Sequence, residues 1–526
     1  MAPVAPNLSP ASSRPHHVVY VGFDAMDHRA AGKFAAAGAM PNVAKLLASA
    51  PHTVVKNPVG FVVGGIWPSF RTGRWPGRHG RHCYVQLEVG TYDFVPVAPA
   101  DIDGTHFWVD VAAADKRILA MDMPFSVAVP EAGGVQILDW GSHDRRVAYA
   151  TVPEPEGAAI LEAHGEHPVK PKCDDFARAE RWEELRDGLV RGAATHADIL
   201  LDEVARGDFD LIATVFGESH CAGHQLWKIH DTAYVDHDAQ LRAELGDAFV
   251  DVYSALDAQL GRLLDALPDA LVYLHMSHGM GAHHDGDHLL AEILRRLDDP
   301  GARTGVRERL GRLAHRAKGL VRPLVPHRYR RAAYQRRRSG VADRIVEDRR
   351  TRRFFHHPNN TMYSGIRINL EGREPEGKVS RAELDDTVSW LRAELESLVD
   401  PATGRELVTA VLRVSDLYDG PHLDELPDLV VDWNRDAPIS KASSPTIGTV
   451  TGRYASTRSG DHRLDGHLFV TGPGSEGIDL GESVDLVDIA PTIAGHFGVT
   501  LDDIDGRPIP GLAEVTVARR GPQPSN

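Results

Sequence analysis

One aspartate and four histidines in this chain have the residue types and sequence positions of metal ligands. They are Asp24, His220, His224, His278 and His462, and each follows or lies within a short apolar run that predicts a β-strand. In an open α/β sheet the strand ends converge on one edge, so side chains remote in sequence can meet there. A carboxylate gathered with several imidazoles suits a transition-metal ion. The pattern therefore predicts a metalloenzyme.

Each candidate also has a structural alternative. Asp24 could cap the helix that follows it, and His220 and His224, four residues apart, could be two ordinary surface histidines. Glu218 is a candidate ligand or general base. Ser277, at the end of another predicted strand, is either a turn residue or a functional group. We predict the aspartate and the histidines as ligands, and we name Glu218 and Ser277 as candidate catalytic residues.

Alternating strands and helices must position these residues. Predicted strands cover residues 17–23, 117–122, 209–216 and 271–274, which are mostly continuous apolar runs, as in buried parallel strands. Predicted helices cover residues 40–50, 177–205 and 253–267, and an extended segment near 54–63 leads to a turn at 67–70. This alternation indicates an α/β fold with a doubly wound, mostly parallel sheet, whose first part spans residues 17–300.

The second half of the chain has a different pattern. Residues 365–370 and 428–433 alternate between apolar and polar types, and residues 380–399 are predicted to form a helix. We therefore predict a small inserted α+β lobe over 356–445, a return to the core over 446–511 and a loose tail over 512–526.

A basic segment separates these two parts. Between Gly301 and Arg353 there are 18 lysine and arginine residues against four acidic ones. Taken alone, such a segment is typical of an anion-binding arm. The alternative is a solvated helical insertion whose arginines pair with acids on the body of the protein. We predict an Arg-rich helical insertion over 301–355 and leave its role open.

The composition restricts the class of protein. The 526 residues are 42% hydrophobic and 25% charged, as in ordinary globular proteins. Three scattered cysteines without a CxxC pair argue against a disulfide scaffold and fit a reducing compartment. The N-terminus lacks signal-peptide features, and no run reaches the roughly 18 apolar residues of a membrane helix. We expect a soluble cytoplasmic protein, and the net charge of −16 disfavours non-specific nucleic-acid binding.

Several motifs occur in one order along the chain. They are Val21-Gly22-Phe23-Asp24, Pro41-Asn42, Thr72-Gly73 with Pro76 and His79-Gly80, His220 with His224, Ser277-His278-Gly279-Met280, the segment Arg367–Gly377, His462-Arg463-Leu464-Asp465-Gly466, and Asp488-Ile489-Ala490-Pro491-Thr492. Through them the chain resembles the alkaline phosphatase superfamily, specifically its type I phosphodiesterase/nucleotide pyrophosphatase branch. The resemblance runs from about residue 17 to about residue 511, which is nearly the whole chain.

The resemblance implies a hydrolase with two metal ions around a phosphoryl group. In the family one ion activates a threonine or serine nucleophile and the other stabilises the leaving oxygen. Four residues of this chain match the family's ligand positions, namely Asp24, His224, His278 and His462. These matches imply the same general reaction.

Three positions depart from the family pattern. His220 and Ser277 stand where the family usually has aspartate. The nucleophile is expected nine residues before Thr72, where this chain has Val63. Valine cannot attack phosphorus, and the resemblance places Ser69 and Thr72 beyond the nucleophile, on the following helix.

These departures change the expected metal content and mechanism. His220, His224 and His462 suit one zinc ion with an open position for water. The second site would keep little beyond Asp24 and His278, so a second ion is uncertain, and Mn²⁺ is an alternative to zinc. The expected reaction is hydrolysis of phosphate esters or diesters, or of related phosphonate or sulfate groups, by metal-activated water. The substrate would be a small phosphorylated or otherwise anionic molecule.

Two other functions remain open. The first is a single-metal enzyme of different chemistry on the same fold, which the altered Val63 and Ser277 positions would allow. The second is a non-catalytic member that binds a phosphorylated ligand or partner. The retained set of histidines weighs against the second, because a decayed site need not keep three imidazoles.

Overall fold

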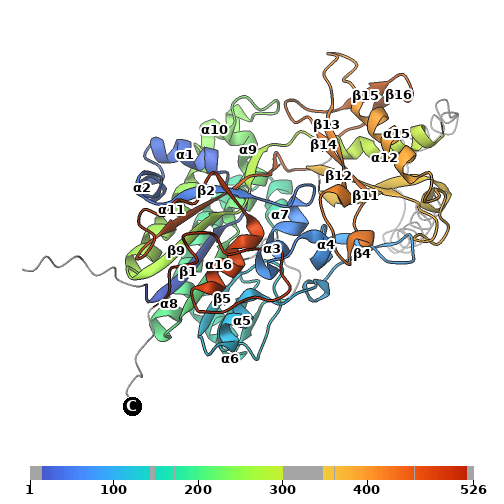
Figure 1. Cartoon of the computed structure of the whole chain (residues 1–526). Coiled ribbons are helices and arrows are strands. Elements are labelled where there is room, and N and C mark those ends of the chain that lie inside the picture. Colours follow the sequence, from blue (N-terminus) through green and yellow to red (C-terminus); the bar gives the residue numbers. More distant parts are fainter. Residues whose placement is uncertain are drawn as a thin grey trace, which may run out of the picture. The chain divides into compact units, whose positions relative to one another are not determined.

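The computed structural model describes residues 15–141, 148–170, 172–299, 348–360, 362–454 and 456–517 (Figure 1). They form two compact units. The first contains the segments up to Arg81, Ala98–His283 and from Ser456 onwards, and the second contains His82–Val97 and His284–Ala455. Most of the predicted basic insertion (residues 301–347) lies outside the described residues, and so does the predicted tail from residue 518.

A nine-stranded sheet forms the centre of the first unit. Its strand order is β19-β2-β18-β9-β1-β8-β5-β6-β7. Strands β9, β1, β8, β5 and β6 are parallel neighbours, whereas β18 is antiparallel to β9 and β2, and β7 to β6. The bounds are β1 His17–Phe23, β2 His52–Lys56, β5 Ile118–Met121, β6 Gly134–Leu138, β7 Ala150–Val152, β8 Leu211–Phe216, β9 Ala270–Met276, β18 Gly466–Thr471 and β19 Ser483–Asp485. The predicted α/β fold with a mostly parallel sheet is confirmed.

The three central strands, β9, β1 and β8, are buried almost throughout. In the register of the sheet, Phe23 at the end of β1 lies between Phe216 of β8 and Met276 of β9. Helices cover both faces of such a sheet, which explains the continuous apolar runs. The three strands end at the same edge, and Asp24, the start of helix α9 and Ser277 follow directly.

Helices of the first unit pack around this sheet. Their bounds are α1 His28–Ala36, α2 Pro41–Ser49, α3 Val62–Thr72, α4 Pro76–His79, α5 Phe107–Ala113, α6 Pro155–His164, α7 Cys173–Arg178, α8 Trp182–Arg206, α9 Glu218–His230, α10 Ala239–Leu245, α11 Ala248–Ala266 and α16 Ile489–Gly495. Two short strands, β10 (Gly279–Ala282) and β17 (Gly460–Arg463), pair with each other. Among the described residues, no helix is long and apolar enough to cross a membrane.

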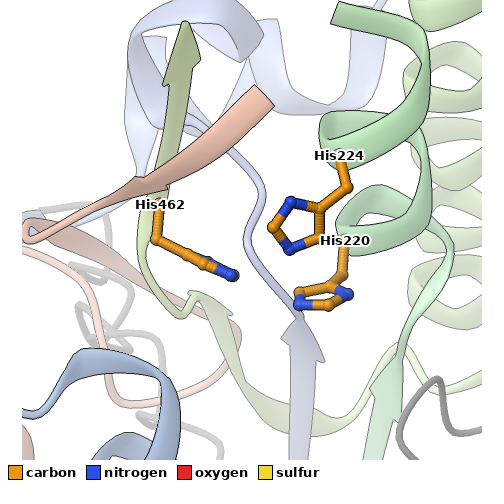
Figure 2. A group of neighbouring side chains, drawn as sticks. All are labelled: His220, His224 and His462. Carbon is orange, nitrogen blue, oxygen red and sulfur yellow. The ribbon is translucent and has the colours of Figure 1, made fainter. Parts of the chain in front are cut away.

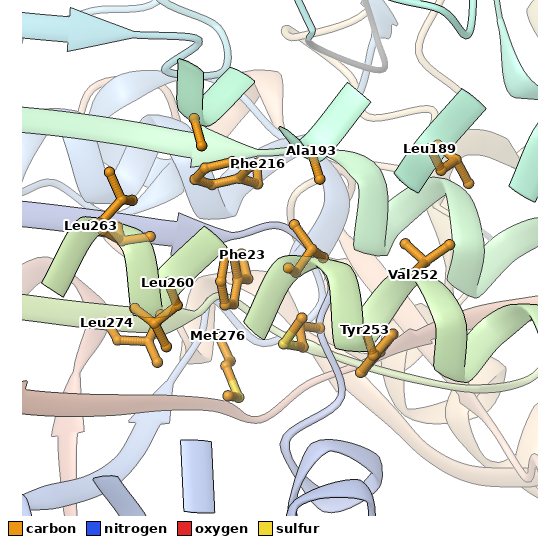
Figure 3. Packing of buried hydrophobic residues seen from close by; sticks show 14 of the residues in the cluster. Phe23, Leu189, Ala193, Phe216, Val252, Tyr253, Leu260, Leu263, Leu274 and Met276 are labelled. Atoms are coloured by element: carbon orange, nitrogen blue, oxygen red, sulfur yellow. The ribbon is translucent and has the colours of Figure 1, made fainter. Parts of the chain in front are cut away.

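The core of the first unit joins α8 and α11 to the central strands (Figure 3). Leu189 of α8 and Val252 and Leu260 of α11 belong to the same buried cluster as Phe23 and Phe216. Burial of each large apolar side chain contributes roughly 1.5–3 kcal/mol. The strand ends that carry the candidate ligands are therefore fixed by a large apolar cluster.

The second unit contains a separate four-stranded antiparallel sheet, with order β11-β12-β14-β13. Side chains of its helices α12 and α15 share one buried cluster with this sheet. The bounds are β3 Val85–Leu87, β4 Phe94–Pro96, α12 Asp287–Asp298, β11 Phe354–Asn360, β12 Tyr363–Ile368, α15 Leu384–Glu396, β13 Val408–Arg413, β14 Leu429–Trp433, β15 Lys441–Ser444 and β16 Gly448–Thr451. Tyr92 joins the β3–β4 hairpin to this unit, because its hydroxyl donates to Asn369 Oδ1 at 2.9 Å.

Helix α3 differs from the sequence prediction. The predicted extended segment near residues 54–63 agrees with β2 only up to Lys56, and the predicted turn at 67–70 is wrong, since α3 is continuous and contains Pro68. Proline removes one intrahelical hydrogen bond, but nearly every residue of α3 is buried, so tertiary burial outweighs local propensity. Val63 and Trp67 are four residues apart and consequently lie on one face of the helix.

Candidate active site

Three buried histidines of the first unit face one another. His220 and His224 lie one turn apart on α9, and His462 lies on β17, opposite Met280 of β10. One ring nitrogen from each histidine lies within 4.8 Å of the other two. Figure 2 shows the three rings gathered between α9 and the strand that carries His462. The arrangement can offer three nitrogen ligands to one ion.

A hydrogen bond sets the tautomer of His224. Its Nδ1 lies 2.8 Å from the carbonyl oxygen of Gly460, which can only accept, so Nδ1 carries the proton and donates. Nε2 is then the nitrogen with the lone pair, as in a metal ligand. Arg458 places Nη1 3.4 Å from this Nε2 and contacts the carboxylate of Asp174 at 3.3 Å. The guanidinium adds a positive charge that favours an anion beside the histidines.

Asp24, Ser277 and His278 form an adjoining group. The Ser277 hydroxyl donates to Asp24 Oδ1 at 3.3 Å and lies 2.9 Å from His278 Nδ1. His278 Nε2 lies 3.1 Å from His462 Nδ1. The structure therefore brings all five predicted ligands together and places Ser277 between two of them.

His278 and His462 are neutral at physiological pH. Burial lowers the pKa of His462 to about 4, although the charge of Asp461 partly opposes this shift. Burial, followed by repulsion from His462 and His275, holds the pKa of His278 well below its usual 6.5. Because a neutral imidazole is the form that binds a metal ion, both side chains have the protonation state of a ligand.

A cavity opens beside these groups. Its lining residues are Asp24, Val63, Ile66, Trp67, Asp122, Pro124, Phe125, Asp139, Val215, Gly217, His220, His278 and His462. The indole Nε1 of Trp67 donates to Asp24 Oδ1 at 2.9 Å and so fixes this carboxylate at the cavity wall. The cavity therefore combines carboxylates and imidazoles with an apolar wall from α3.

A family model describes most of the chain. The model of the type I phosphodiesterase/nucleotide pyrophosphatase family matches residues 18–462. The chain belongs to this family. The predicted resemblance and the prediction of a phosphoester hydrolase are thereby confirmed. None of the curated proteins matches the chain.

Solved structures share the fold at low sequence identity. Phosphonoacetate hydrolase from Sinorhizobium meliloti 1021, in complex with phosphonoacetate, is 12% identical with a TM-score of 0.54, over 92% of this chain and 96% of its own. Murine ectonucleotide pyrophosphatase/phosphodiesterase 5 is 11% identical with a TM-score of 0.51, over 93% and 97%. The alkaline phosphatase PafA is 14% identical with a TM-score of 0.51, over 96% and 99%. These matches show an alkaline phosphatase-like fold.

The position at which the sequence resemblance places the nucleophile is apolar. Val63 lines the cavity, and none of the described lining residues is serine, threonine or cysteine. The two hydroxyls farther along α3 have other partners. Ser69 Oγ lies 3.0 Å from His79 Nε2, and Thr72 Oγ1 donates to the carbonyl oxygen of Pro68 at 2.7 Å.

Glu218 and Asp122 belong to a buried network next to the candidate metal ligands. Glu218 Oε1 lies 3.2 Å from His167 Nε2, and Glu218 is absent from the cavity lining within the described chain. Asp122 lines the cavity, accepts the backbone N–H groups of Trp140 and Gly141 at 2.7 Å each, and lies 3.6 Å from a His196 nitrogen. Burial raises the pKa of Asp122 to about 8, so this carboxyl retains its proton near neutral pH.

Three residues at the site were not predicted. Asp122 directly follows β5, and the strand-end argument that singled out Asp24 applies equally to it. Trp67 was hidden by the wrong prediction of a turn at residues 67–70. Arg458 lies in a segment without regular structure, and nothing in the local sequence indicates its approach to His224.

Proposed function

We propose that this protein is a metal-dependent hydrolase of phosphate esters or diesters, or of related phosphonate or sulfate groups, that acts without a side-chain nucleophile. The observation that carries the proposal is a group of three buried imidazoles beside a cavity lined by Val63, the residue that the sequence resemblance assigns to the nucleophile position. Family membership supplies the reaction class. A metal-dependent hydrolase can transfer the phosphoryl group directly to water.

We assign one zinc ion to His220, His224 and His462. Three imidazoles form a common catalytic zinc donor set and leave one position open. The set fits zinc because the Nδ1 proton of His224 is donated to Gly460, so that its Nε2 is the donor atom. A zinc ion held there would polarise a phosphoryl oxygen and lower the pKa of water to about 7. Mn²⁺ is the alternative, although an all-nitrogen donor set favours zinc.

Asp24 and His278 would hold a second cation only weakly. A carboxylate and an imidazole leave most of a coordination shell to water or substrate. We assign Ser277 the role of orienting both side chains, in agreement with its contacts to Asp24 Oδ1 and His278 Nδ1. Arg458, which Asp174 holds beside His224, is placed to bind an oxygen of an anionic substrate.

The function is tested with a substrate panel. Zinc-loaded protein is assayed with p-nitrophenyl phosphate, bis(p-nitrophenyl) phosphate, p-nitrophenyl sulfate and phosphonoacetate, the ligand of the S. meliloti neighbour. We expect zinc-dependent hydrolysis of at least one ester, and no phosphorylated protein by mass spectrometry after acid quenching. A trapped phosphoprotein would overturn the direct-water mechanism. Bound zinc without hydrolysis would favour a single-metal enzyme of different chemistry, and absence of bound metal would favour a non-catalytic member.

Replacement of Val63 by alanine tests the nucleophile position directly. We expect the Val63→Ala variant to keep kcat/KM within about tenfold of the wild type, because no atom of the valine side chain attacks phosphorus. The measurement is steady-state kinetics on the best substrate of the panel. A loss above about a thousandfold would assign this position an essential role and contradict the proposal.

Replacement of Trp67 by phenylalanine tests the orientation of Asp24. The ring contact with Phe70 can persist, but the hydrogen bond to Asp24 Oδ1 is lost. We expect kcat/KM to fall by about tenfold to a hundredfold, as for other groups that orient ligands, with the tightly bound zinc retained. Trp227→Phe is the matched control, because its indole donates to Asp231, which is not a ligand. Loss of zinc in Trp67→Phe would show that Asp24 belongs to the tight site.

A further inference from the structure

A pair of histidines lies across two adjacent strands, apart from the site described above. His52 begins β2, and His467 lies on β18, its antiparallel neighbour. The two rings meet nitrogen to nitrogen, with His52 Nδ1 3.1 Å from His467 Nε2. His52 is exposed and His467 is partly buried, so an ion could reach the pair from solvent.

Aromatic packing holds the two imidazoles in place. Phe469 contacts both rings, with centroids 5.3 Å from His52 and 4.8 Å from His467. His28, at the start of α1, stacks on His467 with centroids 5.1 Å apart and ring planes 15° apart. The ring of His467 is therefore stacked on His28 and also contacts Phe469. Because the two side chains are already held in place, they would lose little conformational entropy on binding a metal ion.

The chemistry of the pair suits a cation. Burial, with the nearby His28 and His52, lowers the pKa of His467 to about 4, and burial also lowers that of His28. Neutral imidazoles repel each other little and keep one lone pair each for a metal ion. Within the described residues, His467 Nδ1 has no hydrogen-bond partner, so the proton can reside there and leave Nε2 as the donor.

We propose that His52 and His467 form a second transition-metal site, specific for zinc, nickel or copper ions, that clips β2 to β18. Two nitrogens bound at about 2.0–2.1 Å to one ion, at angles between square and tetrahedral, lie about 2.9–3.4 Å apart. The observed separation of 3.1 Å falls in that range. Water completes the coordination, and the ion stabilises the antiparallel pairing of the two strands.

Isothermal titration with Zn²⁺ tests the site in the full chain, after desalting has left only tightly held metal. We expect the wild type to gain thermal stability and to bind one further equivalent that depends on His52 and His467, apart from any weak binding at Asp24 and His278. His52→Gln and His467→Ala should each weaken this step by at least about tenfold and remove the thermal gain, with the desalting-resistant metal and the hydrolytic activity unchanged.

His164→Ala is the matched control, because this partly buried histidine pairs with Asp202 instead. It should retain the further equivalent. Unchanged titration in both His52→Gln and His467→Ala would overturn the proposal and leave a plain N–H···N hydrogen bond. Because His52 is exposed, its variant keeps the test valid if His467→Ala fails to fold. Failure of the three-histidine site would instead appear as loss of the desalting-resistant metal.

Discussion

A His224→Ala variant is expected to lose the tightly bound zinc, and its kcat/KM for the best substrate should fall by more than about a hundredfold. Removal of groups that only orient a ligand already costs about tenfold to a hundredfold, and His224 is one of three nitrogen donors within 4.8 Å of one another. Metal analysis after desalting and steady-state kinetics measure the two effects. The same loss is expected when a chelator removes the metal from the wild type, with recovery on addition of zinc.

His230→Ala is the matched control for this prediction. His230 lies on the same helix, α9, and its Nδ1 contacts Asp247 Oδ2 at 3.1 Å. Its removal should affect packing without changing the zinc content. If His224→Ala folds, as judged by circular dichroism, and retains both zinc and activity, the three-histidine site is refuted. If both variants lose zinc, the loss reflects damage to α9 rather than removal of a ligand.

The sequence could predict the candidate ligands because most of them directly follow an apolar run that predicts a strand, or have the spacing of one helix turn. The apolar run of β1 is buried and parallel to its neighbours, so the residue after it, Asp24, must lie at the sheet edge. His220 and His224 differ by four residues, which places them on one helix face when a helix follows the strand. The prediction of His462 had less local support, since β17 is a short strand outside the main sheet.

Contacts made by side chains across the fold could not be predicted in the same way. Trp67 reaches Asp24 only because burial keeps α3 helical through Pro68, against the local preference for a turn. The residues around Tyr92 join the second unit through a hydrogen bond to Asn369, 277 residues away. No local pattern encodes such a partner, because the bond depends on the completed fold.

The buried polar groups of the first unit give it a specific pH dependence. In the metal-free protein, we expect thermal stability to be greatest near pH 6.5. Burial lowers the pKa values of His106, His196 and His275 to about 2, 4 and 3. Below about pH 6.5 the unfolded chain binds protons at these histidines and the folded chain does not. The free energy of unfolding therefore decreases as the pH falls, by up to about 1.4 kcal/mol per pH unit for each histidine.

Asp122 acts in the opposite direction. Its pKa in the folded protein is about 8, above its usual 3.8. The stability that it contributes is therefore fully present below pH 3.8 and is lost as the pH rises through about 8. Between pH 4 and 6.5 its bound proton offsets the proton of one such histidine, and between pH 6.5 and 8 it makes the free energy of unfolding decline.

Two variants separate these contributions in melting curves recorded from pH 4.5 to 8.5 with a chelator present. His275→Gln should reduce the acid-side slope, because the unfolded chain then binds one proton fewer in excess of the folded chain. Asp122→Asn should abolish the alkaline decline and steepen the acid side. His164→Gln, at a partly exposed position paired with Asp202, should leave the profile unchanged. An unaltered alkaline decline in Asp122→Asn would show that Asp122 is ionised in the folded protein, and the cavity would then carry one more negative charge to attract a second cation.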